Sequence, residues 1–306
     1  MSDVSQPSWA SFLDAHAWSE LVRLVDEAFA RRSLPATWRA DEGGVELVHP
    51  ERGTITFGLV NLAQMMHQLP QPAEWRRMVG HHVRVFLAAA DDTSPPEPSE
   101  FAGIKDQLRI RLYPTSAVDP SVPIVGMPVM PGVVAALARD LPDSVVTVPK
   151  DDARAWGLED RDLLALALHN TVQEDCGSET VTLDDGVKVI AWSGQSFFVA
   201  SRVLALERWL DVKAGALVVI PNRHLAIFHP IVDDHAIQAM DDLWAMAQQP
   251  FREGPGSITP DLFWWTPGRF MKIPVTVDEA QESMSVEPPA ELIEVLKTVM
   301  GDELDA

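Results

Sequence analysis

The chain has 306 residues, 46% of them hydrophobic, which is enough for one large domain or two ordinary domains with real cores. Its 45 acidic and 24 basic residues give a formal net charge of −21, which disfavours nucleic acids and anionic membranes as partners. The single cysteine, Cys176, excludes an intrachain disulfide and a cysteine-based zinc site, and it fits a reducing compartment.

The opening stretch, MSDVSQPSWASFLDAHAW, predicts no targeting segment because it has neither a basic region nor a continuous apolar run. No apolar run approaches the ~20 residues that cross a bilayer. We therefore expect a cytoplasmic protein. Because the chain contains no Walker loop and no Gly-x-Gly-x-x-Gly motif, we also expect no cofactor.

Residues 8–90 predict a first lobe of helix, hairpin and helix. Apolar residues recur at helical spacing over residues 9–32, with Ser8 as the cap, although Asp14 and His16 interrupt the pattern and allow two shorter helices. The stretches VELV and TITFGLV alternate as strands around the turn HPERG, and two helical stretches follow. Residues 91–104 are rich in proline, serine and acids, which predicts a linker.

Residues 105–276 predict a second lobe. LRIRLYP reads as a strand, VVAALARDLP and SVVTVP as a strand pair, and EDRDLLALALHNTVQ as a helix. GALVVIP and HLAIFHP form a predicted hairpin, followed by a helix in DDHAIQAMDDLWAMAQQ. Residues 277–306 predict an acidic tail with a terminal helix. The fold class predicted is α+β, with two lobes of mostly antiparallel strands and helices packed on one face of each.

Two stretches of equal length resemble each other without gaps. GVELVHPERGTITFGLVNLA and GVKVIAWSGQSFFVASRVLA both read as strand, turn, strand and helix. They indicate either one hairpin–helix unit used twice or a chance similarity between alternating segments.

The stretch RHLAIFHPIVDDH, residues 223–235, is the most histidine-rich part of the chain. A regular strand would point His224 and His229 to opposite faces, so they cannot chelate one ion together. Asp233 and Asp234 precede a predicted helix, where N-cap chemistry explains both acids. We therefore favour a strand-to-helix junction, and the alternative is a metal site formed by His229, Asp233 and His235.

The aromatic segment DLFWWTPGRF favours an interaction surface or a covered strand. Trp264, Trp265 and Phe270 lie near Arg269, and exposed tryptophan beside arginine is typical of binding hot spots. The alternative is a strand whose two faces are both covered. We take Trp264, Trp265, Arg269 and Phe270 as the candidate binding residues.

An ordered series of motifs in residues 108–266 resembles a widespread bacterial family of unknown function. RLYP, DDARAWGLEDRDLLALALHNT, GQSFFVASRVL, GALVVIPNRHLAIFHPI and FREGPGSITPDLFWW follow the order of its iyP, wgl…Al-Nl, DGYDASRIL, PHqD-LI and F-eG-PIT motifs. The match to DGYDASRIL keeps Ala200, Ser201, Arg202 and Leu204 but neither acid. Asn222 stands for the family's histidine and His224 for its aspartate. The resemblance implies a cytosolic α/β fold and carries over no reaction, cofactor or ligand.

Three functions follow as hypotheses. The first is a non-catalytic protein-binding or regulatory module that engages another protein through Trp264 and its neighbours. The second is a metal-dependent or hydrolase-like enzyme, with Ser201, Arg202 and His229 as the candidate catalytic residues. No Gly-x-Ser-x-Gly elbow frames Ser201. The third is a small-molecule binding protein with a cleft between its lobes.

Overall fold

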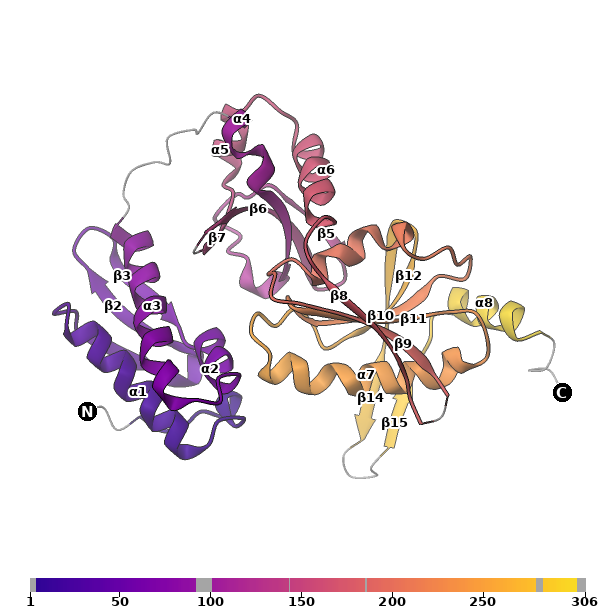
Figure 1. Ribbon diagram of the computed structural model, residues 1–306, viewed down its shortest axis with the longest axis horizontal. Coiled ribbons are helices and arrows are strands. Elements are labelled where there is room, and N and C mark those ends of the chain that lie inside the picture. The colour runs from indigo at the N-terminus through magenta and orange to yellow at the C-terminus, as the bar shows by residue number, and fades with distance from the viewer. Residues whose placement is uncertain (1–3, 92–100, 143, 185, 279–282, 302–306) are drawn as a thin grey trace. The chain divides into compact units, whose positions relative to one another are not determined.

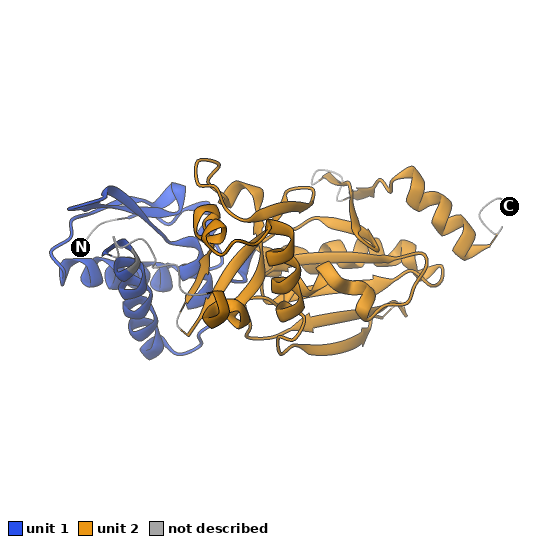
Figure 2. Ribbon diagram, turned by 90° about the horizontal axis from the view of Figure 1, so that it is seen from above, with its two compact units in different colours: residues 1–97, 252–255 blue, residues 98–251, 256–306 orange. Residues whose placement is uncertain are grey.

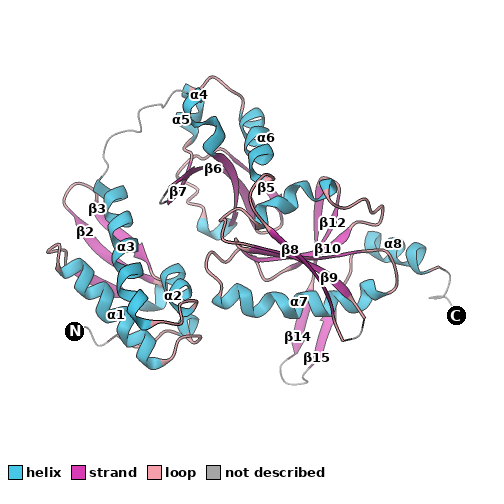
Figure 3. Cartoon of the chain, in the orientation of Figure 1, coloured by secondary structure: helices cyan, strands magenta, loops and turns pink. Residues whose placement is uncertain are grey.

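The computed structural model describes residues 4–91, 101–142, 144–184, 186–278 and 283–301. The chain divides into two compact units, residues 1–97 with 252–255 and residues 98–251 with 256–306 (Figure 2). Most of the predicted linker, residues 92–100, lies outside the described residues. The protein is α+β, with antiparallel sheets and packed helices (Figure 3).

The first unit packs helices against a three-stranded antiparallel sheet of order β1-β2-β3 (Figure 1). Its elements are η1 (Ser8–Ala10), α1 (Ala15–Ala30), β1 (Ala36–Arg39), η2 (Ala40–Glu42), β2 (Gly44–His49), β3 (Gly53–Gly58), α2 (Val60–His67) and α3 (Pro72–Asp91). The predicted first helix begins at the interruption: the Asp14 carboxylate accepts a hydrogen bond from the Ala17 amide and caps α1. Leu21, Leu47 and Leu62 are among the fully buried side chains of its core.

The second unit contains a four-stranded sheet in which β6 is central. β6 (Val133–Leu141) pairs with β4 (Leu108–Pro114) along one edge and with β5 (Gly126–Met130) and β7 (Ser144–Thr147) along the other. The remaining elements of this region are α4 (Phe101–Ile104), η3 (Lys105–Gln107), η4 (Thr115–Ala117), α5 (Lys150–Ala155) and α6 (Asp160–Thr171). β4 alternates, so Leu108, Ile110 and Leu112 enter the core while Arg111 and Tyr113 lie on its other face.

The same unit contains a six-stranded antiparallel sheet of order β13-β12-β10-β11-β9-β8. Its strands are β8 (Gly177–Thr182), β9 (Lys188–Ser193), β10 (Ala216–Asn222), β11 (Leu225–Pro230), β12 (Leu262–Thr266) and β13 (Arg269–Ile273). The predicted hairpin is β10 and β11, and every residue of β10 is buried.

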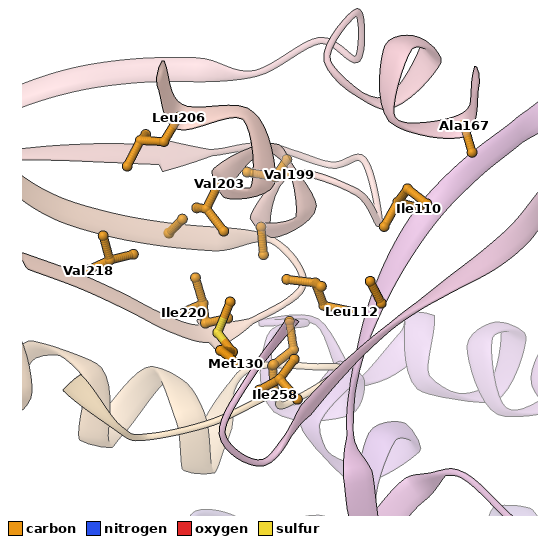
Figure 4. Packing of buried hydrophobic residues seen from close by; sticks show 14 of the residues in the cluster. Ile110, Leu112, Met130, Ala167, Val199, Val203, Leu206, Val218, Ile220 and Ile258 are labelled. Carbon is orange, nitrogen blue, oxygen red and sulfur yellow. The ribbon is translucent and has the colours of Figure 1, made fainter. Parts of the chain in front are cut away.

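Both faces of this sheet are covered, where helices on one face were expected. On one face, Val218 and Ile220 pack with Ile110 and Leu112 of β4 and with η5 (Ala200–Arg208), as Figure 4 shows. On the other face, Leu217 and Val219 pack with α7 (His235–Glu253). The sheet is therefore the centre of the unit's hydrophobic core.

The described part of the acidic tail belongs to the second unit. β14 (Val275–Asp278) pairs with β15 (Ser283–Val286), and α8 (Ala290–Met300) buries Leu292 and Leu296 in the same cluster as α7. The boundary expected at residue 276 therefore falls inside the β14–β15 hairpin.

Of the two explanations for the internal sequence similarity, a repeated hairpin–helix unit is not what the described fold has. In the first copy, β2, β3 and α2 follow one another as expected. In the second copy, β9 is followed by turns over residues 195–199 and by η5, a 3-10 helix, instead of a second strand and an α-helix. The sequence similarity is thus not matched by a similar supersecondary structure.

Candidate functional site

Three segments of the second unit meet at the turn between β10 and β11. The backbone of Arg223 donates to the Gly256 carbonyl at 3.0 Å, and its carbonyl accepts from the Ala200 amide at 3.2 Å. The Gly194 amide donates to the His224 carbonyl at 3.3 Å. These segments contain GQSFFVASRVL, PNRH and the GSIT end of FREGPGSIT, so parts of three of the stretches on which the family resemblance depends are neighbours in space.

Arg223 places a guanidinium group inside this junction. Its side chain is buried, with 5% of the residue exposed, and the guanidinium carbon lies 4.1 Å from the centroid of the Phe197 ring. Gly256 has a φ of +74°, and a Cβ there would lie 2.6 Å from the Arg223 Cδ. A glycine is therefore needed at 256, both for the backbone conformation and for the close approach of the arginine methylenes.

The charge of Arg223 has no carboxylate partner among the described residues. Its Nε donates to the Nε2 of His224 at 2.9 Å, and its two terminal nitrogens have no hydrogen bond among the described residues. They are not among the fully buried atoms without a partner, so they reach solvent. Burial, followed by repulsion from Arg111, lowers the pKa of Arg223 to about 10, and Tyr113 acts in the opposite direction. The group therefore remains cationic at neutral pH.

His224 is held as a neutral imidazole. Burial, followed by the charge of Arg223, lowers its pKa to about 4. Its Nδ1 lies 3.2 Å from the Gly194 carbonyl oxygen and 3.1 Å from that of Ser196, so Nδ1 carries the proton and donates. Its Nε2 is left as the acceptor for Arg223. The imidazole thus orients the guanidinium without neutralising it.

Arg111 supplies a second guanidinium near this junction. Its positive charge contributes to lowering the pKa of both Arg223 and His224. Its guanidinium carbon lies 4.7 Å from the centroid of the Tyr113 ring, and it forms no ion pair with any described residue. Two cations thus lie close enough for their charges to interact, and neither forms an ion pair with a described residue, in a chain with a large excess of acids.

His224 makes the stability of the protein depend on pH. Because its pKa in the folded state is about 4, against an ordinary 6.5, its contribution is present above pH 6.5 and is lost as the pH falls toward 4. We expect His224→Gln to remove this dependence, on the order of 1–2 kcal/mol after reduction for partial exposure. Urea unfolding of both proteins across this pH range measures it, and parallel pH profiles would contradict it.

The predicted metal residues lie around a separate pocket of about 460 Å³ at the start of α7. His229, Asp233 and His235 line it together with Lys188. Asp233 accepts a hydrogen bond from the His235 amide at 3.1 Å, as expected for a strand-to-helix junction.

Among the described residues, the side chains with ligand atoms all within 4.8 Å of one another are Asp233, Asp234 and His235, a set without His229. His229 is 3% exposed, its Nδ1 donates to the Lys188 carbonyl at 2.8 Å, and its Nε2 has no hydrogen-bond partner in the part of the chain that the structure describes. The structure therefore brings the three predicted ligands to one pocket without the geometry of one ion site.

Ser201 and Arg202 lie in η5 and do not form a catalytic pair with His229. Ser201 is buried, and its amide donates to the Phe198 carbonyl. The Arg202 guanidinium carbon lies 4.7 Å from the Trp209 ring centroid and 5.2 Å from that of Trp192, and its Nη1 donates to the Glu174 carbonyl. Arg202 thus joins η5 to β9, which is a packing role.

The predicted aromatic binding surface is interior. Trp264 is 6% exposed and Trp265 is 1% exposed, because β12 lies between β10 and β13 with both faces covered. Arg269 is exposed and pairs with Glu291, while Phe270 is half-buried against Phe263. The expectation of exposed tryptophans is therefore wrong, and the alternative of a covered strand is what the structure has.

Sequence reasoning missed Arg223 as a functional candidate. The available signal was the position of Arg223 in PNRH, between the two residues at which this chain differs from the family motif. An arginine in a hairpin turn, however, usually faces solvent. Only the packing of Phe197 and Gly256 shows that this one is buried. Comparison of the chain with protein-family models, curated proteins and solved structures finds no match, so the family resemblance stays a prediction.

Proposed function

We propose that this protein binds a small anionic ligand in its second unit, through Arg223 with Arg111 beside it. The observation that supports this proposal is the buried, charged guanidinium of Arg223 without a carboxylate among the described residues. Removing most of a guanidinium from water costs free energy when no counter-ion is present, and the terminal nitrogens of Arg223 still reach solvent, where a ligand can contact them. A bound oxyanion would remove that cost.

The geometry of the guanidinium suits this ligand. Arg223 has its Nε occupied by His224, and its terminal nitrogens offer N–H donors to an oxyanion. Because the chain has a net charge of −21, its long-range field repels anions. Binding must therefore depend on these local groups in a low-dielectric setting.

The first test is calorimetric titration with inorganic phosphate. We expect the wild-type chain to bind phosphate and Arg223→Met to weaken binding at least tenfold, which corresponds to the ~1.5–3 kcal/mol of a hydrogen bond to a charged group. Arg161→Met is the matched control. Its side chain is 87% exposed, and the variant changes the net charge equally. This control should bind phosphate as the wild type does.

Two results would contradict the proposal. One is the absence of binding by the wild type at about 20 mM phosphate, well above the ~1 mM dissociation constant of a weak small ligand. The other is an equal loss in Arg161→Met, which would show a general charge effect. The melting temperature without phosphate is an internal check. Because Arg223→Met keeps the aliphatic packing and removes an unpaired charge, it should not melt markedly lower than the wild type.

The unpartnered Nε2 of His229 favours a second candidate function, binding of a divalent transition metal in the pocket at α7. An imidazole whose Nδ1–H is fixed on a carbonyl presents Nε2 as a metal ligand. Exposed Asp233 and half-buried His235 would have to move to join it. If the pocket binds a metal in this way, native mass spectrometry with Zn²⁺ should show one ion per chain, and His229→Ala should lose it. A bare wild-type chain would leave the pocket without a metal role.

The expectation of a protein partner stays a proposal, but Trp264 and Trp265 no longer supply its surface. Among the described helices, none has both the length and the apolar character needed to cross a bilayer. A cytoplasmic location, expected from the sequence, is part of the same proposal.

A further inference from the structure

A small pocket lies at the end of β4, lined by Tyr113; neither Arg111 nor Arg223 lines it. Its volume is about 200 Å³, and its walls are mainly apolar, with Val118, Val122 and Ile124 among them. Cavities of ~150 Å³ accept a benzene-sized guest. This pocket therefore has room for one six-membered ring, and it is smaller than the ~300 Å³ at which sites for larger ligands begin.

Tyr113 connects this pocket to Arg111. Its ring lines the pocket, and the Arg111 guanidinium lies over the same ring. The Tyr113 hydroxyl is 2.8 Å from the Oγ1 of Thr147, which also lines the pocket. This hydrogen bond holds the Tyr113 ring at the wall of the pocket, and the same ring is contacted by Arg111.

We propose that the anionic ligand is a phosphate monoester of a molecule with one apolar ring, whose phosphate contacts Arg223 and Arg111 and whose ring enters the Tyr113 pocket. This inference rests on the proposed anion-binding function and names its ligand class. Two guanidinium groups match the charge of a phosphate monoester, close to −2 at neutral pH. The ring would stack against Tyr113.

Asp119 indicates that the end of the ligand that enters the pocket carries no negative charge. Asp119 lines the pocket, and hydrogen bonds from the hydroxyl and amide of Ser121 hold its pKa below the ordinary value. The carboxylate is therefore ionised at neutral pH and repels negative charge at this end. A dianion with its charges at opposite ends, such as a long dicarboxylate, fits less well than a phosphate ester with a neutral ring.

The test compares inorganic phosphate with phenyl phosphate on the full chain. We expect phenyl phosphate to bind at least about tenfold more tightly, because the ring is taken out of water. Val122→Asn should remove most of this advantage, measured as the ratio of the affinities for the two compounds within the same variant. Val146→Asn is the control, since Val146 is 48% exposed, Val122 is 50% exposed, and only Val122 lines the pocket.

The outcomes separate this inference from the proposed function. If phosphate binds through Arg223 but phenyl phosphate binds no more tightly, the ring pocket is wrong and the anion site stands. An advantage that survives in Val122→Asn, or falls equally in Val146→Asn, also overturns the ring pocket. If neither compound binds, the proposed function itself fails.

Discussion

Gly215→Ala is expected to lower the free energy of unfolding by about 4 kcal/mol or more, the range reached only by exceptional single substitutions. Gly215 has a φ of +78°, and a Cβ there would lie 2.0 Å from the Trp265 carbonyl oxygen and 3.0 Å from the Trp264 Nε1. That nitrogen donates to the Ala214 carbonyl at 2.9 Å, so it is not free to move away. Relief therefore requires a shift of β12.

Gly268→Ala is the matched control for Gly215. Gly268 has a φ of +77°, but a Cβ there would meet nothing within 4 Å. Its alanine variant should show only the conformational cost of a left-handed residue, about 1–2 kcal/mol. Chemical denaturation of both variants gives the comparison. Equal losses would show that β12 is not packed against Gly215 as the structure has it.

Trp265→Ala is expected to cost about 3–5 kcal/mol, the usual range for removing a buried tryptophan. The residue is 1% exposed and packs in the cluster that joins β10, β12 and β4. Trp209→Ala should cost less, because Trp209 is 40% exposed. Urea unfolding followed by circular dichroism compares the two. A Trp265 variant with wild-type stability would contradict its place in the core and return it to the candidate binding surface.

Local chemistry explains which parts of the fold could be predicted. In the first helical stretch the sequence predicts a cap at Ser8 and an interruption at Asp14. The interruption is where α1 begins, with Asp14 as its cap, whereas Ser8 is not a cap, because the short η1 has Pro7 at that position. Alternation predicts β4, and an unbroken apolar run predicts β10. In each case the signal lies within a few residues of the element that it predicts.

Long-range packing explains what could not be predicted. Residues 195–199 end in an apolar run that predicts a strand, yet they form bends and a turn. The Gly194 and Ser196 carbonyls contact the His224 imidazole from thirty and twenty-eight residues away in the chain. Adjacent tryptophans in β12 are compatible with one or two covered faces, and only the presence of η5 on one side and α7 on the other decides between them.

The two candidate sites also differ in how much of each could be predicted from the sequence. The residues around His229 are close in sequence, so their pocket was partly predictable, although the sequence could not show that His229 lies outside the ligand set of Asp233, Asp234 and His235. The site at Arg223 combines a hairpin turn with β4, a strand about 110 residues earlier, and its burial depends on Phe197 and Gly256. No local pattern carries that information.

The most direct test of anion binding is a crystal structure of the protein soaked with tungstate, an oxyanion located by its anomalous scattering. We expect one strong site beside the terminal nitrogens of Arg223, with nitrogen–oxygen distances of about 2.7–2.9 Å, as in charge-assisted hydrogen bonds. A crystal with no anomalous site at Arg223, or with those nitrogens paired to a carboxylate of the protein, would contradict the proposed function.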